Sequence, residues 1–289
     1  MKPSFLIVLL TLLSGIALMG VAKPGDSGGL PTPMADYKVL APISHGDLTI
    51  FPVVSTKAHD TGQFITLDEG IRSGEVVVTE VGYLHSTMHR RNSYVQPNRR
   101  AEVNRLVLVN NSRHPLILLA GEVVTGGKQD RVVGKDRIVP AESDPVDLSV
   151  FCVEHGRWVE TSTKFDTHAS VMLQPSVRMK AMAEQDQQKV WDEVGRSRAA
   201  MATALGPAAP PAPNQASSGD YASSVQQLDS TTSYAKAREN KAVKAQVDSI
   251  VQPIQKSYES VIKQLRNQNA IGVVVAVKGR IVWADMFAS

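Results

Sequence analysis

The sequence predicts an α+β fold: a mostly antiparallel β-sandwich or partial barrel with two long helical segments and a C-terminal β-hairpin. From Tyr37 to about residue 160, short runs rich in β-branched residues are bounded by Gly, Pro, Asn or Asp, as is typical of strands and turns. No segment of helical periodicity separates these runs, which favours antiparallel pairing over β-α-β units. From Ser176 the composition changes to Ala, Met, Gln, Glu and Lys, which is typical of helices.

The N-terminus has the pattern of a secretory signal peptide over residues 1–22. Lys2 supplies a positive start, Phe5–Val21 is almost wholly apolar, and small residues lead up to the expected cleavage after Ala22. The alternative is an inner-membrane anchor formed by residues 5–21, since a spanning helix needs roughly 17 to 25 apolar residues. A Gly- and Pro-rich spacer follows over residues 23–36. We therefore expect an exported bacterial protein, periplasmic or extracellular, whose only membrane contact is this segment if it is uncleaved.

We expect one α+β domain over residues 37–289. Its strands are predicted in the runs YKVLAPI, LTIFPVV, EVVVTEV, RLVLVNN, LILLAGEVV, RVVGKDRIVP and VDLSVFCVE. The segment between Val81 and Arg105 interrupts this series. It is either a solvated surface loop or a basic lip that attracts anions to a nearby pocket. Its cationic and imidazole side chains are His85, His89, Arg90, Arg91, Arg99 and Arg100.

Two helical segments and a hairpin complete the domain. The first helix is expected over residues 176–205, with Val190, Trp191 and Val194 on its packing side, and a flexible Pro/Ala/Ser-rich insertion over about 206–233. The second helical region covers about residues 234–267, where Pro253 either kinks the helix or begins another. Its apolar face predicts core packing or a coiled-coil seam. The last strands are predicted to form a hairpin that turns at Lys278-Gly279.

Composition excludes several classes of function. The 31 basic and 28 acidic residues leave a net charge of only +3, and aromatic residues make up 5% of the chain. A nucleic-acid partner is therefore not expected, because it needs a concentrated basic face or a stacking surface. Cys152 is the single cysteine, so the chain cannot form an intramolecular disulfide and its stability must come from packing.

The stretch from Leu119 to Trp158 gathers most of the chemistry-bearing side chains. Within it, Gly126-Gly127-Lys128 offers backbone N–H groups beside an ammonium, which predicts either a phosphate cradle or a tight hairpin turn. It is not a P-loop, because the required spacing of the first glycine and the hydroxyl residue after the lysine are both absent. Alternation along the following strand places Arg131 on one face, where a buried ion pair with a carboxylate such as Glu122 is a structural alternative.

The run CVEHGRW holds the candidate acid–base residues. Glu154 and His155 could both face a cleft if the strand ends before Gly156. Cys152 is either a catalytic nucleophile that works together with His155 or a buried, unreactive thiol within a strand. The carboxylates and histidines lack metal-ligand spacing, so no metal and no cofactor are expected.

The blocks AGEVVTGGKQDRVV, VFCVEHGRW, QQKVWDEV and IGVVVAVKGRIVWADMF together resemble a known family over about residues 37–287. It is the family named for its association with ADP-ribosylglycohydrolase (ARG) and rhodanese-phosphatase domains. The resemblance implies a bacterial domain of unestablished activity. Carried over by motif, it points to Glu122, Gly127, Lys128, Gln129, Arg131, Cys152, Glu154, Arg157 and Trp158.

Three functions remain open from the sequence. The first is a non-catalytic domain that binds an anionic small molecule or a protein partner. The second is a hydrolase of phosphate or glycosidic (ADP-ribose-like) linkages with Glu154 or His155 as base. The third is a purely structural cluster of ion pairs. The first function assigns ligand binding to Glu122, Gly127, Lys128, Gln129, Arg131 and Arg157.

Overall fold

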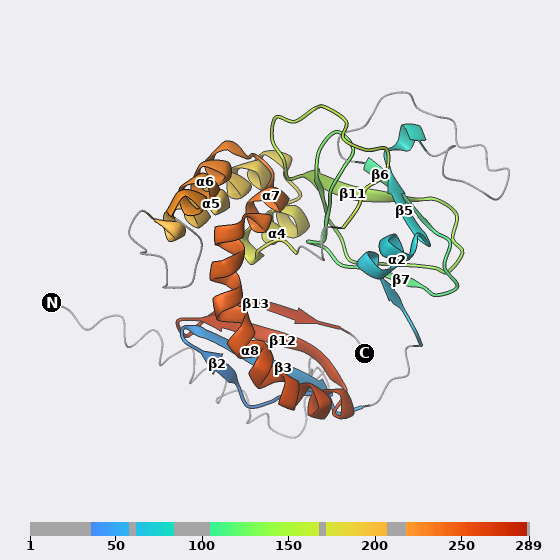
Figure 1. Cartoon of the computed structure of the whole chain (residues 1–289). Helices are drawn as coiled ribbons and strands as arrows, with labels where there is room; N and C mark the ends of the chain where they lie inside the picture. The colour runs from blue at the N-terminus through green and yellow to red at the C-terminus, as the bar shows by residue number, and fades with distance from the viewer. Residues whose placement is uncertain (1–35, 58–61, 84–104, 168–171, 207–217, 288–289) are drawn as a thin grey trace, which may run out of the picture.

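The computed structural model describes residues 36–57, 62–83, 105–167, 172–206 and 218–287 (Figure 1). Two sheets pack against each other in the first half of the domain. The smaller sheet has the order β10-β7-β4, and the larger has the order β5-β6-β11-β9-β8. The strands of the smaller sheet are β4 (Ile65–Thr66), β7 (Leu116–Leu118) and β10 (Arg137–Val139). Those of the larger are β5 (Val76–Thr79), β6 (Arg105–Asn110), β8 (Val123–Val124), β9 (Arg131–Val133) and β11 (Val146–Cys152).

The core between these two sheets is aliphatic. Leu116 and Leu118 from the smaller sheet and Leu106 and Leu108 from the larger are all fully buried in one cluster. Helix α2 (Leu67–Ser73) closes one end of this core, and its N-terminus carries a capping box between Thr66 and Glu69. Pairing is antiparallel except for the short β4–β7 contact. The predicted α+β, mostly antiparallel fold class is confirmed.

The larger sheet is buried on both faces. In β9 and β11, one residue packs against the smaller sheet and the next packs against helices. Val133 and Val150 belong to the core between the sheets, whereas Val132 and Phe151 contact the helical layer. Successive side chains of a strand point to opposite faces, so continuous apolar runs form here instead of an apolar–polar alternation.

The helical layer consists of several elements, of which α5 is the longest. They are α4 (Pro175–Met179), the π-helix η2 (Lys180–Glu184), α5 (Gln187–Leu205), α6 (Ser218–Ser230) and α7 (Tyr234–Glu239). Val190 and Val194 of α5 are buried against the larger sheet, as the sequence predicts, and Trp191 is partly buried. The prediction of a single helix over 176–205 was wrong. The chain leaves the helical conformation at Gln185, whose φ is positive, and Asp186 caps the start of α5.

Two other helical boundaries differ from expectation. Residues 218–230 form α6 within the stretch expected to be flexible, because Leu228 packs against Leu205 and Val243 and tertiary contact overrides composition. The second helical region breaks at Asn240, whose side chain caps α8 (Lys241–Asn267), and Pro253 lies inside α8. Helix α8 is partly buried: Val243 joins the cluster of Leu205 and Leu228, Ile254 and Leu265 are also buried, and the helix crosses the C-terminal sheet (Figure 1).

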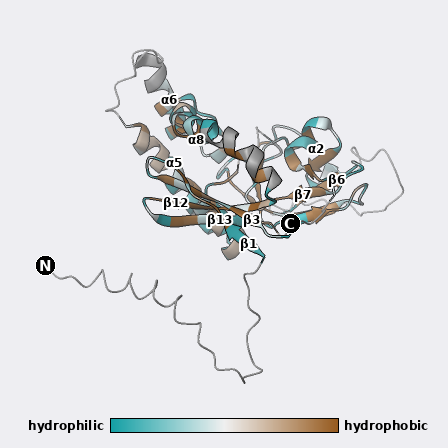
Figure 2. Cartoon of the chain, turned by 90° about the horizontal axis from the view of Figure 1, so that it is seen from below, coloured by the Kyte–Doolittle hydropathy of each residue, from teal (hydrophilic) through white to brown (hydrophobic). Residues whose placement is uncertain are grey.

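The third sheet joins the two ends of the domain. It contains β1 (Tyr37–Val39), β2 (Ile43–His45), β3 (Leu48–Ser55), β12 (Ala270–Val277) and β13 (Arg280–Met286). The hairpin between β12 and β13 turns at Lys278-Gly279 with φ values of 51° and 72°, which confirms that prediction. Figure 2 shows apolar colour concentrated along strands such as β3 and β12.

Some expectations fall outside the described residues. They are the signal segment 1–22, nearly all of the spacer, and the basic segment with His85, His89 and Arg90. Within the described ranges, no helix combines the length and apolar character that crossing a membrane requires.

Candidate functional site

The Gly126-Gly127-Lys128 segment forms the turn between β8 and β9. Both glycines have positive φ, 131° and 48°. A Cβ at Gly127 would lie 2.5 Å from Cζ of Phe165 and 2.9 Å from Oε1 of Glu80. The turn therefore needs glycine both for its backbone conformation and for close packing against the segment around Phe165.

The N–H groups of this turn are already engaged by the chain itself. Gly126 N–H donates to Oδ1 of Asp130 at 3.3 Å, and Lys128 N–H donates to Oε1 of Glu80 at 3.1 Å. Gly127 N–H donates to the Ser162 hydroxyl at 3.4 Å. A phosphate cradle needs such donors to be available. Here the N–H groups of Gly126 and Lys128 already donate to carboxylates of the protein, which take the position that a bound anion would need.

Asp130, Glu154 and Arg157 form a buried ion-pair network beside the turn. Arg157 Nε lies 2.5 Å from Oε2 of Glu154, and its Nη2 lies 3.2 Å from Oδ1 of Asp130. The same guanidinium donates to the carbonyls of Gly126, Gly127 and Val159 at 3.2, 2.9 and 2.9 Å. The side chains of Asp130 and Glu154 are 6% and 4% exposed, and the single guanidinium of Arg157 contacts both of these buried carboxylates.

The network also reaches the helical layer. The Ser233 hydroxyl, which caps α7, donates to Oδ2 of Asp130 at 2.7 Å. Tyr234 N–H donates to the carbonyl of Val153 at 3.2 Å, and Glu154 forms an isolated bridge with Ser233. We call Asp130, Glu154, Arg157 and Ser233 the clamp. It ties the β8–β9 turn, the end of β11 and the start of α7 together.

Gln129 and Arg131 lie inside the protein rather than at a surface. Arg131 is 3% exposed, its Nη1 donates to the carbonyl of Gln129 at 2.7 Å, and its burial lowers its pKa. Gln129 is fully buried, and its amide atoms have no hydrogen-bond partner among the described residues. A solute in bulk water does not reach either side chain in this conformation.

The candidate acid–base residues do not converge. Glu154 points into the clamp, whereas His155 is exposed and packs edge-on to Trp191 with ring centroids 4.6 Å apart. Cys152 is fully buried and burial raises the pKa of its thiol to about 11. The Gln187 side chain bonds both the N–H and the carbonyl of Cys152, which holds this residue in the strand. Trp158 is 51% exposed on the surface.

Glu122 lies apart from the clamp. Its Oε2 accepts the N–H of Leu119 at 2.7 Å, and its charged neighbours are Asp136 and Arg178. Burial, and then the Asp136 charge, raise the pKa of Glu122 from 4.5 to about 7. The folded chain therefore holds a proton that the unfolded chain loses near pH 4.5. The protonated Glu122 therefore contributes its whole stabilisation of the fold below about pH 4.5, and this contribution is lost as the pH rises through about 7.

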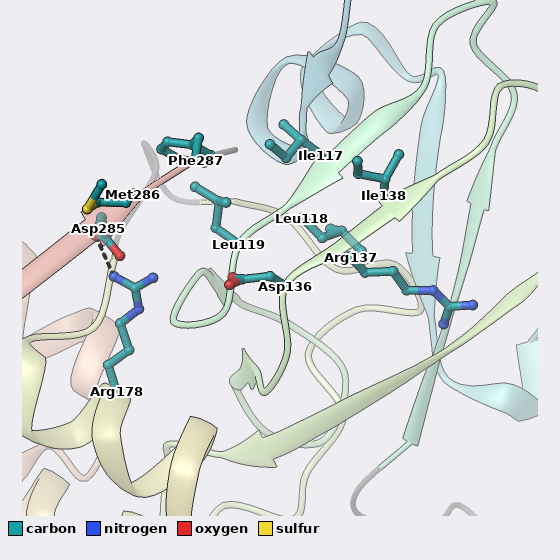
Figure 3. Close-up of a pocket in the computed structure, with 10 residues that line it drawn as sticks. All are labelled: Ile117, Leu118, Leu119, Asp136, Arg137, Ile138, Arg178, Asp285, Met286 and Phe287. Atoms are coloured by element: carbon teal, nitrogen blue, oxygen red, sulfur yellow. Dashed lines mark hydrogen bonds and ion pairs between the residues drawn. The ribbon is translucent and has the colours of Figure 1, made fainter. Parts of the chain in front are cut away.

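A cavity of about 320 Å³ is lined by Leu119, Asp136 and Arg178, the residues that bond Glu122 or act on its charge (Figure 3). We call it the Asp136 cavity. Its walls come from β7, the segment leading into β10, α4 and the end of β13. Its lining residues are Ile117, Leu118, Leu119, Asp136, Arg137, Ile138, Arg178, Asp285, Met286 and Phe287.

Arg178 forms the polar end of this cavity. Its Nη1 lies 2.7 Å from Oδ2 of Asp285, and its Cζ lies 4.6 Å from the centroid of the Trp283 ring. Its aliphatic part sits over Gly121, where a Cβ would lie 2.7 Å from Cδ of Arg178. Arg178 thus joins α4 to the C-terminal hairpin, and Figure 3 shows the Asp136 carboxylate pointing toward it from the opposite wall.

The structure therefore separates the predicted site residues into two places. Glu154, Arg157 and the backbone of Gly127 and Lys128 belong to the clamp or the turn beside it, whereas Glu122 bonds Leu119 in the wall of the Asp136 cavity. Sequence reasoning missed Glu80, Arg178, Ser233 and Asp285, because each meets its partner from a distant part of the chain. Asp136 stands within the central stretch of the sequence, but nothing in its spacing marks it as a cavity residue.

Comparison with known proteins gives one family match. Residues 36–289 match the model of the ARG and Rhodanese-Phosphatase-superfamily-associated Protein domain. No curated protein and no solved structure matches the chain significantly.

Proposed function

The chain belongs to the family of ARG and Rhodanese-Phosphatase-superfamily-associated Protein domains, and on that premise we propose that it is a non-catalytic binding domain of the bacterial envelope. Its clamp is structural, and its binding site is the Asp136 cavity. The apolar segment Phe5–Val21 supports export to the periplasm or the cell exterior. The partner is a small molecule or an exposed group of another protein.

The pairing of Arg157 is the observation that carries this proposal. All three guanidinium nitrogens are engaged by carboxylates, backbone carbonyls or the Thr161 hydroxyl of the same chain. An anion at the GGKQDR turn would have to displace Glu80 and Asp130 from the backbone N–H groups. Exchanging one carboxylate for another anion gains little, and it leaves a buried charge without a partner.

The hydrolase alternative lacks a positioned base. A general base must lie within hydrogen-bond reach of a substrate proton, and Oε2 of Glu154 is held by Arg157 and by the N–H of Asp130. His155 has no carboxylate orienting it among the contacts of the described residues. The arrangement therefore favours binding over acid–base chemistry.

The Asp136 cavity has the features of a binding site instead. Its volume falls at the lower end of the roughly 300–1,000 Å³ typical of ligand pockets. It combines aliphatic walls with a few polar groups, and it lies where two sheets and a helix meet. This combination gives burial for an apolar body and orientation through polar contacts.

Amide chemical-shift mapping of the ¹⁵N-labelled chain against a mixed fragment set tests this assignment. Fragments should shift Leu119, Ala120 and Phe287 and leave Gly126 and Lys128 unmoved. A set of shifts centred on Gly126–Lys128 and saturating with phosphate would overturn it. In parallel, phosphate-ester and ADP-ribosyl substrates should give no turnover. A turnover lost in Glu154→Gln would establish the hydrolase in its place.

A further inference from the structure

We propose that the Asp136 cavity takes a small organic cation, a primary ammonium on a short aliphatic body. This inference rests on the proposed binding role of the cavity and adds the chemical class of its ligand. It follows from which charges around the cavity are already compensated, which are not, and what covers the remaining walls.

Both arginines of the lining are used by other groups. Arg178 is paired with Asp285, so these two charges compensate each other. Arg137 Nη1 donates to the carbonyl of Asp147 at 3.0 Å, and Figure 3 shows its side chain extending away from the other lining residues. Neither guanidinium is thus left to attract an anion into the cavity.

Two carboxylates near the cavity, Asp136 and Glu122, form no salt bridge with any described residue, although the charge of Arg178 acts on Glu122. Asp136 Oδ1 accepts the N–H of Ala120 at 2.7 Å, and Glu122 Oε2 accepts the N–H of Leu119. No hydrogen bond or ion pair engages the second oxygen of Asp136 in the part of the chain that the structure describes. A carboxylate offers about four acceptor sites, and mutual repulsion with Asp136 contributes to the raised pKa of Glu122. An ammonium group at Asp136 would fill its open acceptor sites, and its charge would offset the repulsion between Asp136 and Glu122.

The polar lining is also incomplete at Arg178. Its side chain is 6% exposed, and its buried Nε lacks a hydrogen-bond partner among the described residues. The clamp differs in this respect, because Arg157 has partners on Nε, Nη1 and Nη2. An unsatisfied polar group beside a cavity favours a ligand over a purely structural role. Because this N–H is a donor, it supports the binding role of the cavity, and the choice of a cation rests on Asp136.

The other walls suit an aliphatic body. Ile138, Met286 and Phe287 are 59%, 47% and 41% exposed at the cavity, so a bound alkyl chain would remove their apolar surface from water. These apolar walls favour an organic cation over a metal ion, because a hydrated metal ion would leave their apolar surface in contact with water. The chemistry therefore calls for an organic cation.

The test uses three probes that share one alkyl chain: n-hexylamine, n-hexanol and sodium hexanoate. Each is titrated into the ¹⁵N-labelled chain at pH 7.5, with the amides of Ala120 and Leu119 as reporters because they bond the two carboxylates. Hexylammonium is expected to bind at least about tenfold more tightly than hexanol, and hexanoate weakest. Binding is expected to weaken below pH 7, as Glu122 becomes protonated.

Two variants and one control make the assignment specific. Asp136→Asn keeps an oxygen that can accept from Ala120 and should weaken hexylammonium binding about tenfold while leaving hexanol binding unchanged. Ile138→Ser should weaken all three probes. Asp144→Asn removes an exposed carboxylate outside the cavity and should change nothing.

The outcomes separate the ligand class from the binding role. Equal binding of hexanol or hexanoate at the cavity would overturn the cation and leave the binding role standing. If no probe shifts the cavity amides, both are overturned. Hexylammonium binding that survives Asp136→Asn would also overturn the assignment of the cation to this carboxylate.

Discussion

Replacing Arg157 by alanine tests whether the clamp stabilises the fold. The substitution leaves Asp130 and Glu154 as buried carboxylates, 6% and 4% exposed, without the guanidinium that contacts both. Lys236 is the nearest remaining cation to Glu154, at 3.9 Å, and its side chain is 65% exposed. Breaking a buried pair by removing one partner costs roughly 3–5 kcal/mol.

Two features set the magnitude within that range. Arg157 also bonds three carbonyls, and water entering the vacated space would satisfy some of them. The carboxylates retain their backbone and Ser233 donors, which limits the loss. We therefore expect Arg157→Ala to lower the free energy of unfolding by about 3 kcal/mol at neutral pH, and Arg157→Lys to recover part of it.

Urea unfolding followed by Trp fluorescence measures this loss. Arg105→Ala is the matched control, because Arg105 pairs with Asp147 at the surface, with side chains 46% and 58% exposed, and such pairs contribute about 0–1 kcal/mol. Glu154→Gln in the Arg157→Ala background should restore stability, since it removes a stranded charge. A cost below about 1 kcal/mol for Arg157→Ala would refute a structural role for the clamp.

Three further substitutions or reactions probe other parts of the fold. Glu122→Gln should abolish the fall in stability between about pH 4.5 and 7, because the pKa of Glu122 is raised to about 7. At pH 8 it should raise the free energy of unfolding by up to roughly 3 kcal/mol. A melting-temperature profile against pH that matches the wild type would contradict this. Gly127→Ala should cost roughly 1–3 kcal/mol more than Gly46→Ala, since both glycines have φ near +50° but only Gly127 would meet side-chain atoms; equal melting temperatures would contradict the close packing. Cys152 should resist Ellman's reagent in the folded chain and react in urea, because its thiol is buried with a pKa of about 11; rapid reaction under native conditions would show an accessible thiolate.

Local pattern predicts most of the strands and the C-terminal hairpin. The β-branched runs and the Lys278-Gly279 turn are local signals, and local backbone preference decides them. Val132 and Val133 pack into two different cores, on opposite faces of the larger sheet. The sequence alone does not reveal this, because both residues are apolar and nothing local shows that both faces of the sheet are covered. Composition alone misses α6, because contacts of Leu228 with distant helices stabilise it.

The candidate site is less accessible to sequence reasoning. Polar residues gather in the central stretch, but their partners come from far along the chain. Asp130 meets Ser233 across 103 positions, and Arg178 meets Asp285 across 107. No periodicity encodes such pairs. The sequence consequently identifies a polar stretch without distinguishing an internal clamp from a pocket.

Amide hydrogen exchange of Gly126 and Lys128 tests the closed state of the turn most directly. Their N–H groups donate to Asp130 and Glu80 at 3.3 and 3.1 Å. If the clamp is structural, both amides exchange slowly in the folded chain, and millimolar phosphate leaves their rates unchanged. Fast exchange that phosphate slows would contradict it, because the turn would then be an open anion site.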